Sequence, residues 1–89
     1  MTRPRLTWDK GGTAEIIAIS TDTVTLRSTI PSPPGSRIEG TLTLDPPAKV
    51  RFKVHGSKLQ EDGAFILVGR PIDLEKELRI RLDLLVKDA

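Results

Sequence analysis

The hydrophobic period of this 89-residue chain changes near residue 71, and that change limits what the chain can fold into. Before it, apolar and polar residues mostly alternate within short stretches, which are residues 13–19, 22–28, 37–44, 49–55 and 64–69. After it, apolar residues recur at helical spacing, at Leu74, Leu78, Leu82, Leu85 and Val86. Alternation is typical of half-buried strands, and a period of about 3.6 residues is typical of an amphipathic helix. The pattern predicts short antiparallel strands and then one C-terminal helix over residues 73–87.

This order of elements favours a mainly β fold, a small barrel that carries a helix, and such a shape usually binds something. The length suits one domain, which we place at residues 13–89, with Asp73 as the N-cap of the helix. Residues 1–12 are polar, and Pro4 has no N–H to donate to a sheet. We therefore expect an N-terminal arm or a short edge strand there. Whether a further strand forms from Thr2 to Trp8 stays open.

The composition argues against several kinds of chemistry. The chain has no cysteine, which excludes disulfides and thiolate sites. Its single histidine, His55, makes a poor metal site without a second nitrogen or sulfur ligand. Ser20 has no general base near it in the sequence. We therefore expect no catalytic residues, no metal, no cofactor and no enzyme activity.

The charges are mixed, with 14 basic and 12 acidic residues and a formal net charge of +2. Nucleic-acid-binding proteins usually have a basic stripe with aromatic side chains that stack on bases. Here the aromatic residues are Trp8, Phe52 and Phe65, and both phenylalanines have the positions of core strand residues. No apolar run approaches the ~18 residues of a membrane span, and the first residues lack the apolar segment of a signal peptide. We expect a cytoplasmic protein that binds neither nucleic acid nor membrane.

Two aliphatic residues of the predicted helix, Ile80 and Leu84, lie away from its apolar stripe. At about 100° per residue they fall on a different face of the helix. One explanation is that they are isolated surface aliphatics, which are common. The other is that they contact a protein partner or a second copy of the chain. The second explanation makes them candidate partner-binding residues and allows a homodimer through the C-terminal helix.

Three segments share their pattern and spacing with a known family. Residues 14–26 have the pattern of a hairpin, residues 34–38 that of a turn before a strand, and residues 65–74 that of a last strand leading into a helix. In this order they resemble the PilZ domain, over most of residues 13–86. The resemblance implies a six-stranded antiparallel β-barrel with one C-terminal α-helix. It also implies a role in bacterial signalling or motility, with cyclic di-GMP as the ligand.

The family holds this ligand with an RxxxR arginine pair in the N-terminal arm and a D/NxSxxG motif at the first hairpin. The arm of this chain carries Arg3 and Arg5, spaced RxR. In the second motif Ser20 matches, whereas Ala18 replaces the acidic or amide residue and Thr23 replaces the glycine. Losing one hydrogen bond to a buried base costs about 1–3 kcal/mol, and a β-branched residue resists positive φ. These departures predict a weakened or absent nucleotide site.

Three functional interpretations follow. The leading one is a PilZ-like adaptor domain that acts mainly through protein–protein contacts. The alternative is a working cyclic di-GMP receptor with a divergent site, in which Arg3, Arg5 and Lys10 hold the phosphates and Ser20 with Arg27 frames the base. Arginine suits this task because its guanidinium binds phosphate bidentately and stacks on guanine. The third is a small nucleic-acid-binding barrel, which is the weakest because exposed aromatic residues are scarce.

Overall fold

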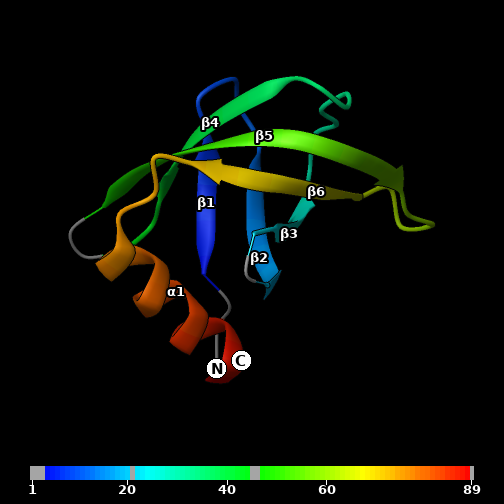
Figure 1. Ribbon diagram of the computed structural model, residues 1–89. Coiled ribbons are helices and arrows are strands. Elements are labelled where there is room, and N and C mark those ends of the chain that lie inside the picture. Colours follow the sequence, from blue (N-terminus) through cyan, green and yellow to red (C-terminus); the bar gives the residue numbers. More distant parts are fainter. Residues whose placement is uncertain (1–3, 21, 45–46, 89) are drawn as a thin grey trace.

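The computed structural model describes residues 4–20, 22–44 and 47–88 of the chain, and Figure 1 shows the strands and the helix that these residues form. Along the chain they are β1 (Arg5–Trp8), β2 (Thr13–Ile19), β3 (Val24–Ser28), β4 (Arg37–Leu42), β5 (Ala48–Leu59), β6 (Phe65–Ile72) and α1 (Lys76–Asp88). The strands form a closed antiparallel barrel in the order β1-β2-β3-β6-β5-β4. The predicted fold class, a mainly β six-stranded barrel with one C-terminal helix, is confirmed.

β1 lies between β2 and β4 and closes the barrel. Leu6 and Trp8 are buried, while the residues that alternate with them are exposed. The expectation of an arm or an edge strand over residues 1–12 is therefore wrong for β1, which pairs on both sides. The physical reason is its two hydrophobic side chains, which gain burial when the strand joins the sheet. Residues 1–3 of the predicted arm lie outside the described residues.

Hydrophobic side chains from every strand fill the inside of the barrel. The rings of Trp8 and Phe52 meet edge to face, with centroids 6.3 Å apart and planes at 90°. The indole N–H of Trp8 donates a hydrogen bond to Oγ of buried Ser28 at 2.9 Å, so neither polar group is left unsatisfied. The other buried hydrophobic residues are Leu6, Ala14, Ile16, Val24, Leu26, Ile38, Leu42, Val50, Val54, Leu67 and Leu82.

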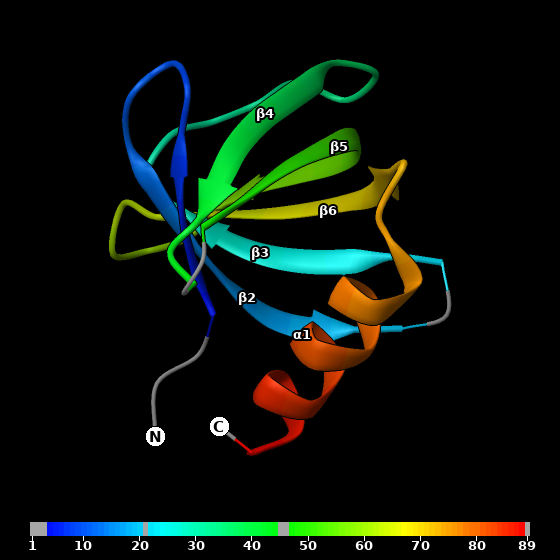
Figure 2. The same ribbon diagram turned by 90° about the vertical axis from the view of Figure 1, so that its left-hand side faces the viewer.

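α1 lies across one end of the barrel, against β2 (Figure 2). Leu82 is fully buried, and Leu74, Leu78 and Val86 pack on the core around it. This confirms the helical stripe for Leu78, Leu82 and Val86, whereas Leu74 packs on the core from the segment before the helix. The stripe is the reason the helix stays on the barrel, because a helix of this length has little stability in water without packing.

The helix begins later than predicted. α1 starts at Lys76, not at residue 73, because Asp73 has a φ of 54° and cannot continue into the helix. The carboxylate of Asp73 accepts a hydrogen bond from Arg51 at 3.2 Å instead of capping α1. The carbonyl of Glu75 accepts the N–H of Arg79 at 2.9 Å, which gives Glu75 the N-cap position.

β5 is longer than the sequence pattern predicts. A β-bulge between Val54 and Gly56 interrupts the alternation, and the strand then continues to Leu59 in a hairpin with β6. β4 pairs with β5 only as far as Lys53. The end of the β5–β6 hairpin therefore extends past β4, while β6 stays paired with β3 as far as Phe65. This end of the hairpin is visible on the right of Figure 1.

Gly40 is a regular member of β4, paired with Trp8 in β1 and Val50 in β5. It is not the bulge that a glycine within a strand can indicate. A Cβ atom at this position would lie 2.7 Å from the carbonyl oxygen of Thr7 and 2.9 Å from the indole ring of Trp8. Glycine is needed here because β1 and β4 approach each other closely.

We predict that Gly40→Ala lowers the free energy of unfolding by about 1–3 kcal/mol, because the added methyl overpacks the contact between β1 and β4. The matched control is Gly56→Ala, also in a strand, where an added Cβ meets no atom within 4 Å. Urea unfolding followed by tryptophan fluorescence measures both variants. Equal effects of the two substitutions would contradict the close approach.

Candidate functional site

Two of the predicted ligand-binding residues lie in one row on the outside of the barrel. Arg5 in β1 pairs with Glu15 in β2, and Glu15 pairs with Arg27 in β3. The side chains of this row line a shallow pocket of about 200 Å³ together with Thr13 and Ala64. We call this the arginine pocket. It presents two guanidinium groups on either side of a carboxylate.

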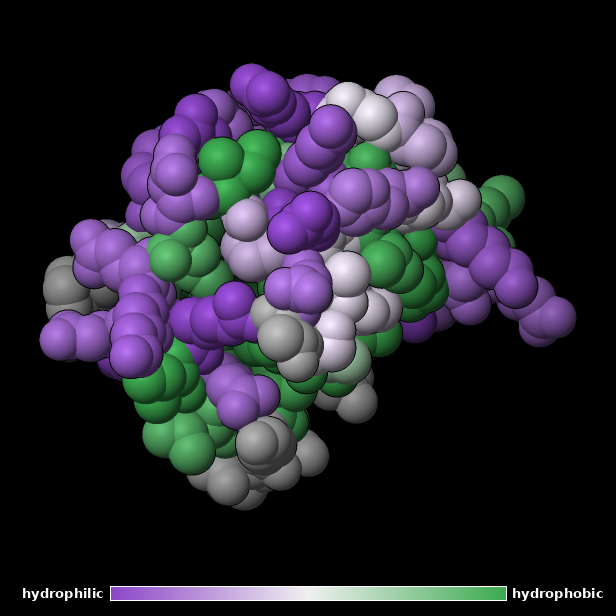
Figure 3. Space-filling view, in the orientation of Figure 1, coloured by the Kyte–Doolittle hydropathy of each residue, from purple (hydrophilic) through white to green (hydrophobic). Residues whose placement is uncertain are grey.

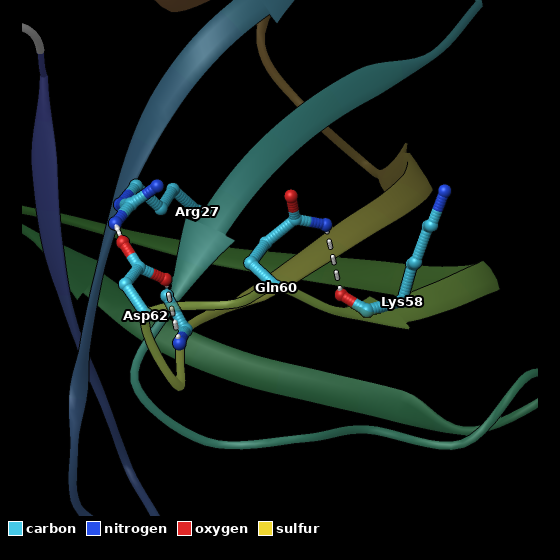
Figure 4. Close-up of polar contacts among 5 residues, drawn as sticks. Arg27, Lys58, Gln60 and Asp62 are labelled. Atoms are coloured by element: carbon cyan, nitrogen blue, oxygen red, sulfur yellow. Dashed lines mark hydrogen bonds and ion pairs between the residues drawn. The ribbon is translucent and has the colours of Figure 1, made fainter.

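Arg27 already has an anionic partner beside this pocket. Its guanidinium forms an ion pair with Asp62, which lies in the turn between β5 and β6 (Figure 4). The other carboxylate oxygen of Asp62 accepts the N–H of Ala64 at 3.1 Å, which holds the carboxylate in place. The two side chains are 40% and 53% exposed, so the pair contributes no more than about 1 kcal/mol. Asp62 therefore occupies one of the guanidinium nitrogens that a ligand phosphate would use and places a negative charge beside the others.

The β5–β6 hairpin adds little further positive charge around this ion pair. The side chain of Lys58 points away from Arg27 and Asp62 (Figure 4). The side-chain amide of Gln60 donates to the carbonyl of Lys58 at 3.4 Å, within the β5–β6 hairpin. Neither residue is directed at the place where an anion would meet Arg27.

Ser20 lies at the opposite end of the β2–β3 hairpin from Arg27. It follows β2 directly, whereas Arg27 is near the end of β3. The distance along the strand from Glu15 to Ser20 is about 16 Å at the usual rise per residue. The structure therefore brings Arg5 and Arg27 together but leaves Ser20 apart, and Arg3 lies outside the described residues.

The hydroxyl of Ser20 is used within its own turn. Its Oγ lies 2.5 Å from Oγ1 of Thr23, and its backbone N–H donates to the carbonyl of Thr23 at 2.9 Å. Among the described residues other than glycine, only Asp73 has a positive φ. Thr23 thus fits this turn without the backbone strain expected where it replaces the glycine of the family motif.

Arg79 is a contact residue that the sequence pattern did not reveal. Its guanidinium donates a hydrogen bond to the carbonyl of Ser20 at 3.1 Å, which ties α1 to the β2–β3 turn. The sequence spacing favours a pair between Arg79 and Glu75 within the helix. Because the two partners of the observed bond are far apart in the chain, no local signal could have indicated it.

Ile80 and Leu84 project from α1 into solvent, as expected from their position off the apolar stripe. Their exposed fractions are 52% and 58%. They are four residues apart and so lie next to each other on one helix face. We call them the α1 pair. Figure 3 shows hydrophobic surface over the region at the lower left where α1 lies in Figure 1.

A third exposed aliphatic residue, Leu59, was missed because the sequence pattern placed it in a loop. It is 63% exposed near the end of the β5–β6 hairpin. Its exposure follows from the extension of that hairpin beyond β4. An apolar residue there was visible in the sequence, but the bulge that keeps it in a strand was not.

Within the part of the chain that the structure describes, no three His, Cys, Asp or Glu side chains come together as a metal site would require. The helical residues there are too few and too polar to cross a bilayer. A scan against protein-family models found no match, and searches of the curated proteins and of the solved structures found no similar chain. The inference of function therefore depends on the fold and surface of this chain.

Proposed function

We propose that the chain is a PilZ-like binding domain that acts as an adaptor through protein–protein contacts, with the α1 pair in its contact surface. The observation that carries this is the double use of α1. One stripe of the helix fills the end of the barrel around Leu82, while Ile80 and Leu84 are more than half exposed on another face. A helix that buries one apolar face in its own barrel and exposes a second is suited to bind another protein through the exposed face.

The form of the α1 pair indicates the kind of contact. Aliphatic residues spaced i, i+4 on a helix are the anchors that an apolar groove on another protein accepts. Two side chains cover much less than the roughly 800 Å² that each partner buries in a stable complex. The pair therefore suits a transient contact with a different protein better than a permanent homodimer. The resemblance to the PilZ family supports an adaptor role in bacterial signalling or motility.

The arginine pocket supports a second candidate, a cyclic di-GMP receptor with a divergent site. Arg5 and Arg27 face the same pocket, and two guanidinium groups suit a phosphate diester. The support is weaker, because Asp62 already pairs with Arg27 and Ser20 is too distant to bind the same ligand. Under this candidate the base would have to be recognised by other residues.

The α1 pair can be tested with a photo-crosslinking amino acid at Leu84, and at Lys58 on the distant hairpin as a control position. We expect proteins of the native cell to crosslink at residue 84, and the identified partner is then purified. Ile80→Gln with Leu84→Gln should weaken binding to it by about five- to a hundredfold, because burying the two exposed aliphatics is worth roughly 1–3 kcal/mol. The free energy of unfolding of this double variant should stay within about 0.5 kcal/mol of the wild-type value.

The matched control for this variant is Leu59→Gln, which changes an exposed aliphatic residue of the β5–β6 hairpin, away from α1. This control should bind the partner as the wild type does. If the purified partner binds the Ile80→Gln, Leu84→Gln variant with unchanged affinity, the α1 pair is not the contact surface.

Calorimetric titration with cyclic di-GMP separates the two candidates. We expect no saturable heat at micromolar concentrations, because Ser20 lies apart from Arg5 and Arg27 and Asp62 already pairs with Arg27. Saturable binding that is lost in Arg5→Ala with Arg27→Ala, but kept in the control Arg81→Ala, would establish the receptor instead. In that case the receptor would replace the adaptor as the favoured function.

A further inference from the structure

Three cationic side chains lie directly opposite one another on the outer face of the barrel. Arg37 in β4 pairs with Lys53 in β5, and Lys53 pairs with Arg70 in β6. All three are exposed, and their strand neighbours Ile38 and Phe52 point into the core. We call Arg37, Lys53 and Arg70 the basic row.

This arrangement is unfavourable for the isolated fold. Like charges directly opposite each other on neighbouring strands destabilise a sheet. Other strand cations avoid the problem by pairing with carboxylates, as in Lys49–Asp9 at 2.9 Å, Arg51–Asp73 at 3.2 Å and Arg27–Asp62. In contrast, no carboxylate of the described residues forms an ion pair with the basic row. The fold thus carries three neighbouring cations that have no ion-pair partner among its described acids; the nearest carboxylate along β4 is that of Glu39, two residues from Arg37.

The surroundings of the basic row add apolar surface. Val68 and Ile72 alternate with Arg70 along β6 and are half-buried on the same outer face. His55, at the bulge of β5, is exposed two residues beyond Lys53. Figure 3 shows hydrophilic side chains with hydrophobic surface between them over the upper part of the barrel, where β4 and β5 run in Figure 1.

We propose that the basic row binds an acidic segment of a protein partner. Neighbouring strands are about 4.8 Å apart, so the backbones of the three residues lie within about 10 Å of one another. Their cationic side chains can therefore reach several carboxylates of one bound segment. The two guanidinium groups would bind carboxylates bidentately, and the ammonium of Lys53 would supply a point charge between them. Val68 and Ile72 provide apolar contact beside the charges, the mixture typical of protein interfaces.

Nucleic acid fits this face less well. Single strands bind where bases stack on exposed aromatic rings. Trp8 and Phe52 are buried in the barrel, and Phe65 is packed against the core. The basic row therefore lacks a stacking platform from Trp8, Phe52 or Phe65. An acidic protein segment needs no such platform.

The probe for this site is a short fluorescently labelled peptide in which glutamates alternate with leucine and serine, followed by anisotropy at low and moderate salt. We expect saturable, salt-sensitive binding to the wild type. Arg37→Gln with Lys53→Gln and Arg70→Gln should weaken it at least tenfold. The control, Lys58→Gln with Lys76→Gln and Arg81→Gln, removes the same charge from exposed positions elsewhere and should weaken binding less than threefold.

Several outcomes would overturn the assignment. Equal losses in both triple variants would show attraction by net charge alone. Absence of peptide binding at low salt would show that the basic row does not bind acidic segments. The proposed ligand would also be wrong if the basic row bound another anion more tightly than the peptide. The two anions to test are a single-stranded oligonucleotide and an anionic phosphatidylglycerol vesicle. Because the α1 pair is intact in every variant, none of these results bears on the adaptor contact of the helix.

A second measurement needs no ligand. Lys53→Gln removes the central charge of the basic row, so we expect the thermal unfolding midpoint to rise by a few degrees. Lys58→Gln, an exposed lysine of the same strand outside the row, should leave the midpoint unchanged. The peptide should raise the midpoint of the wild type but not that of the triple variant, since a ligand stabilises only the state it binds. A midpoint that falls in Lys53→Gln would contradict the repulsion.

Discussion

The insertion of β1 between β2 and β4 is the constraint on which the rest of the barrel depends. Hydrogen bonds reach this segment from both sides. The N–H of Ile16 in β2 donates to the carbonyl of Pro4, and the N–H of Thr43 after β4 donates to the carbonyl of Arg5, each at 2.9 Å. Without β1, two strands would have open edges, which invite association with other chains. The core would also lose Leu6 and Trp8.

Trp8 carries the effect of β1 across the barrel. Its N–H binds Ser28 in β3, and its ring packs against Phe52 in β5, so one side chain joins three strands. The same alternation that buries Trp8 turns Arg5 outwards into the arginine pocket. The outer surfaces are therefore set by the closure of the barrel. A shift of one residue in any strand register would exchange core and surface residues.

Local patterns explain which parts of the fold could be predicted from the sequence. β2 has the predicted bounds, and the stripe around Leu82 faces the core, because both depend on the period of neighbouring residues. The pairing of Leu6 with Leu42 could not be predicted, since it joins residues far apart in the chain. The same holds for the basic row, which exists only through the registers of three strands. The separation of Ser20 from Arg27 has a simpler origin: they occupy opposite ends of one correctly predicted hairpin.

Amide hydrogen exchange measured by NMR tests the central claim most directly, which is that β1 closes the barrel. The amides to follow are those of Asp9, which donates to the carbonyl of Glu39, and of Thr43, which donates to the carbonyl of Arg5. Closure predicts that both exchange nearly as slowly as the amides between β5 and β6, with protection close to that of global unfolding. Rapid exchange of Asp9 and Thr43 beside slow exchange in β5 and β6 would contradict it, and would make residues 5–8 a detached arm.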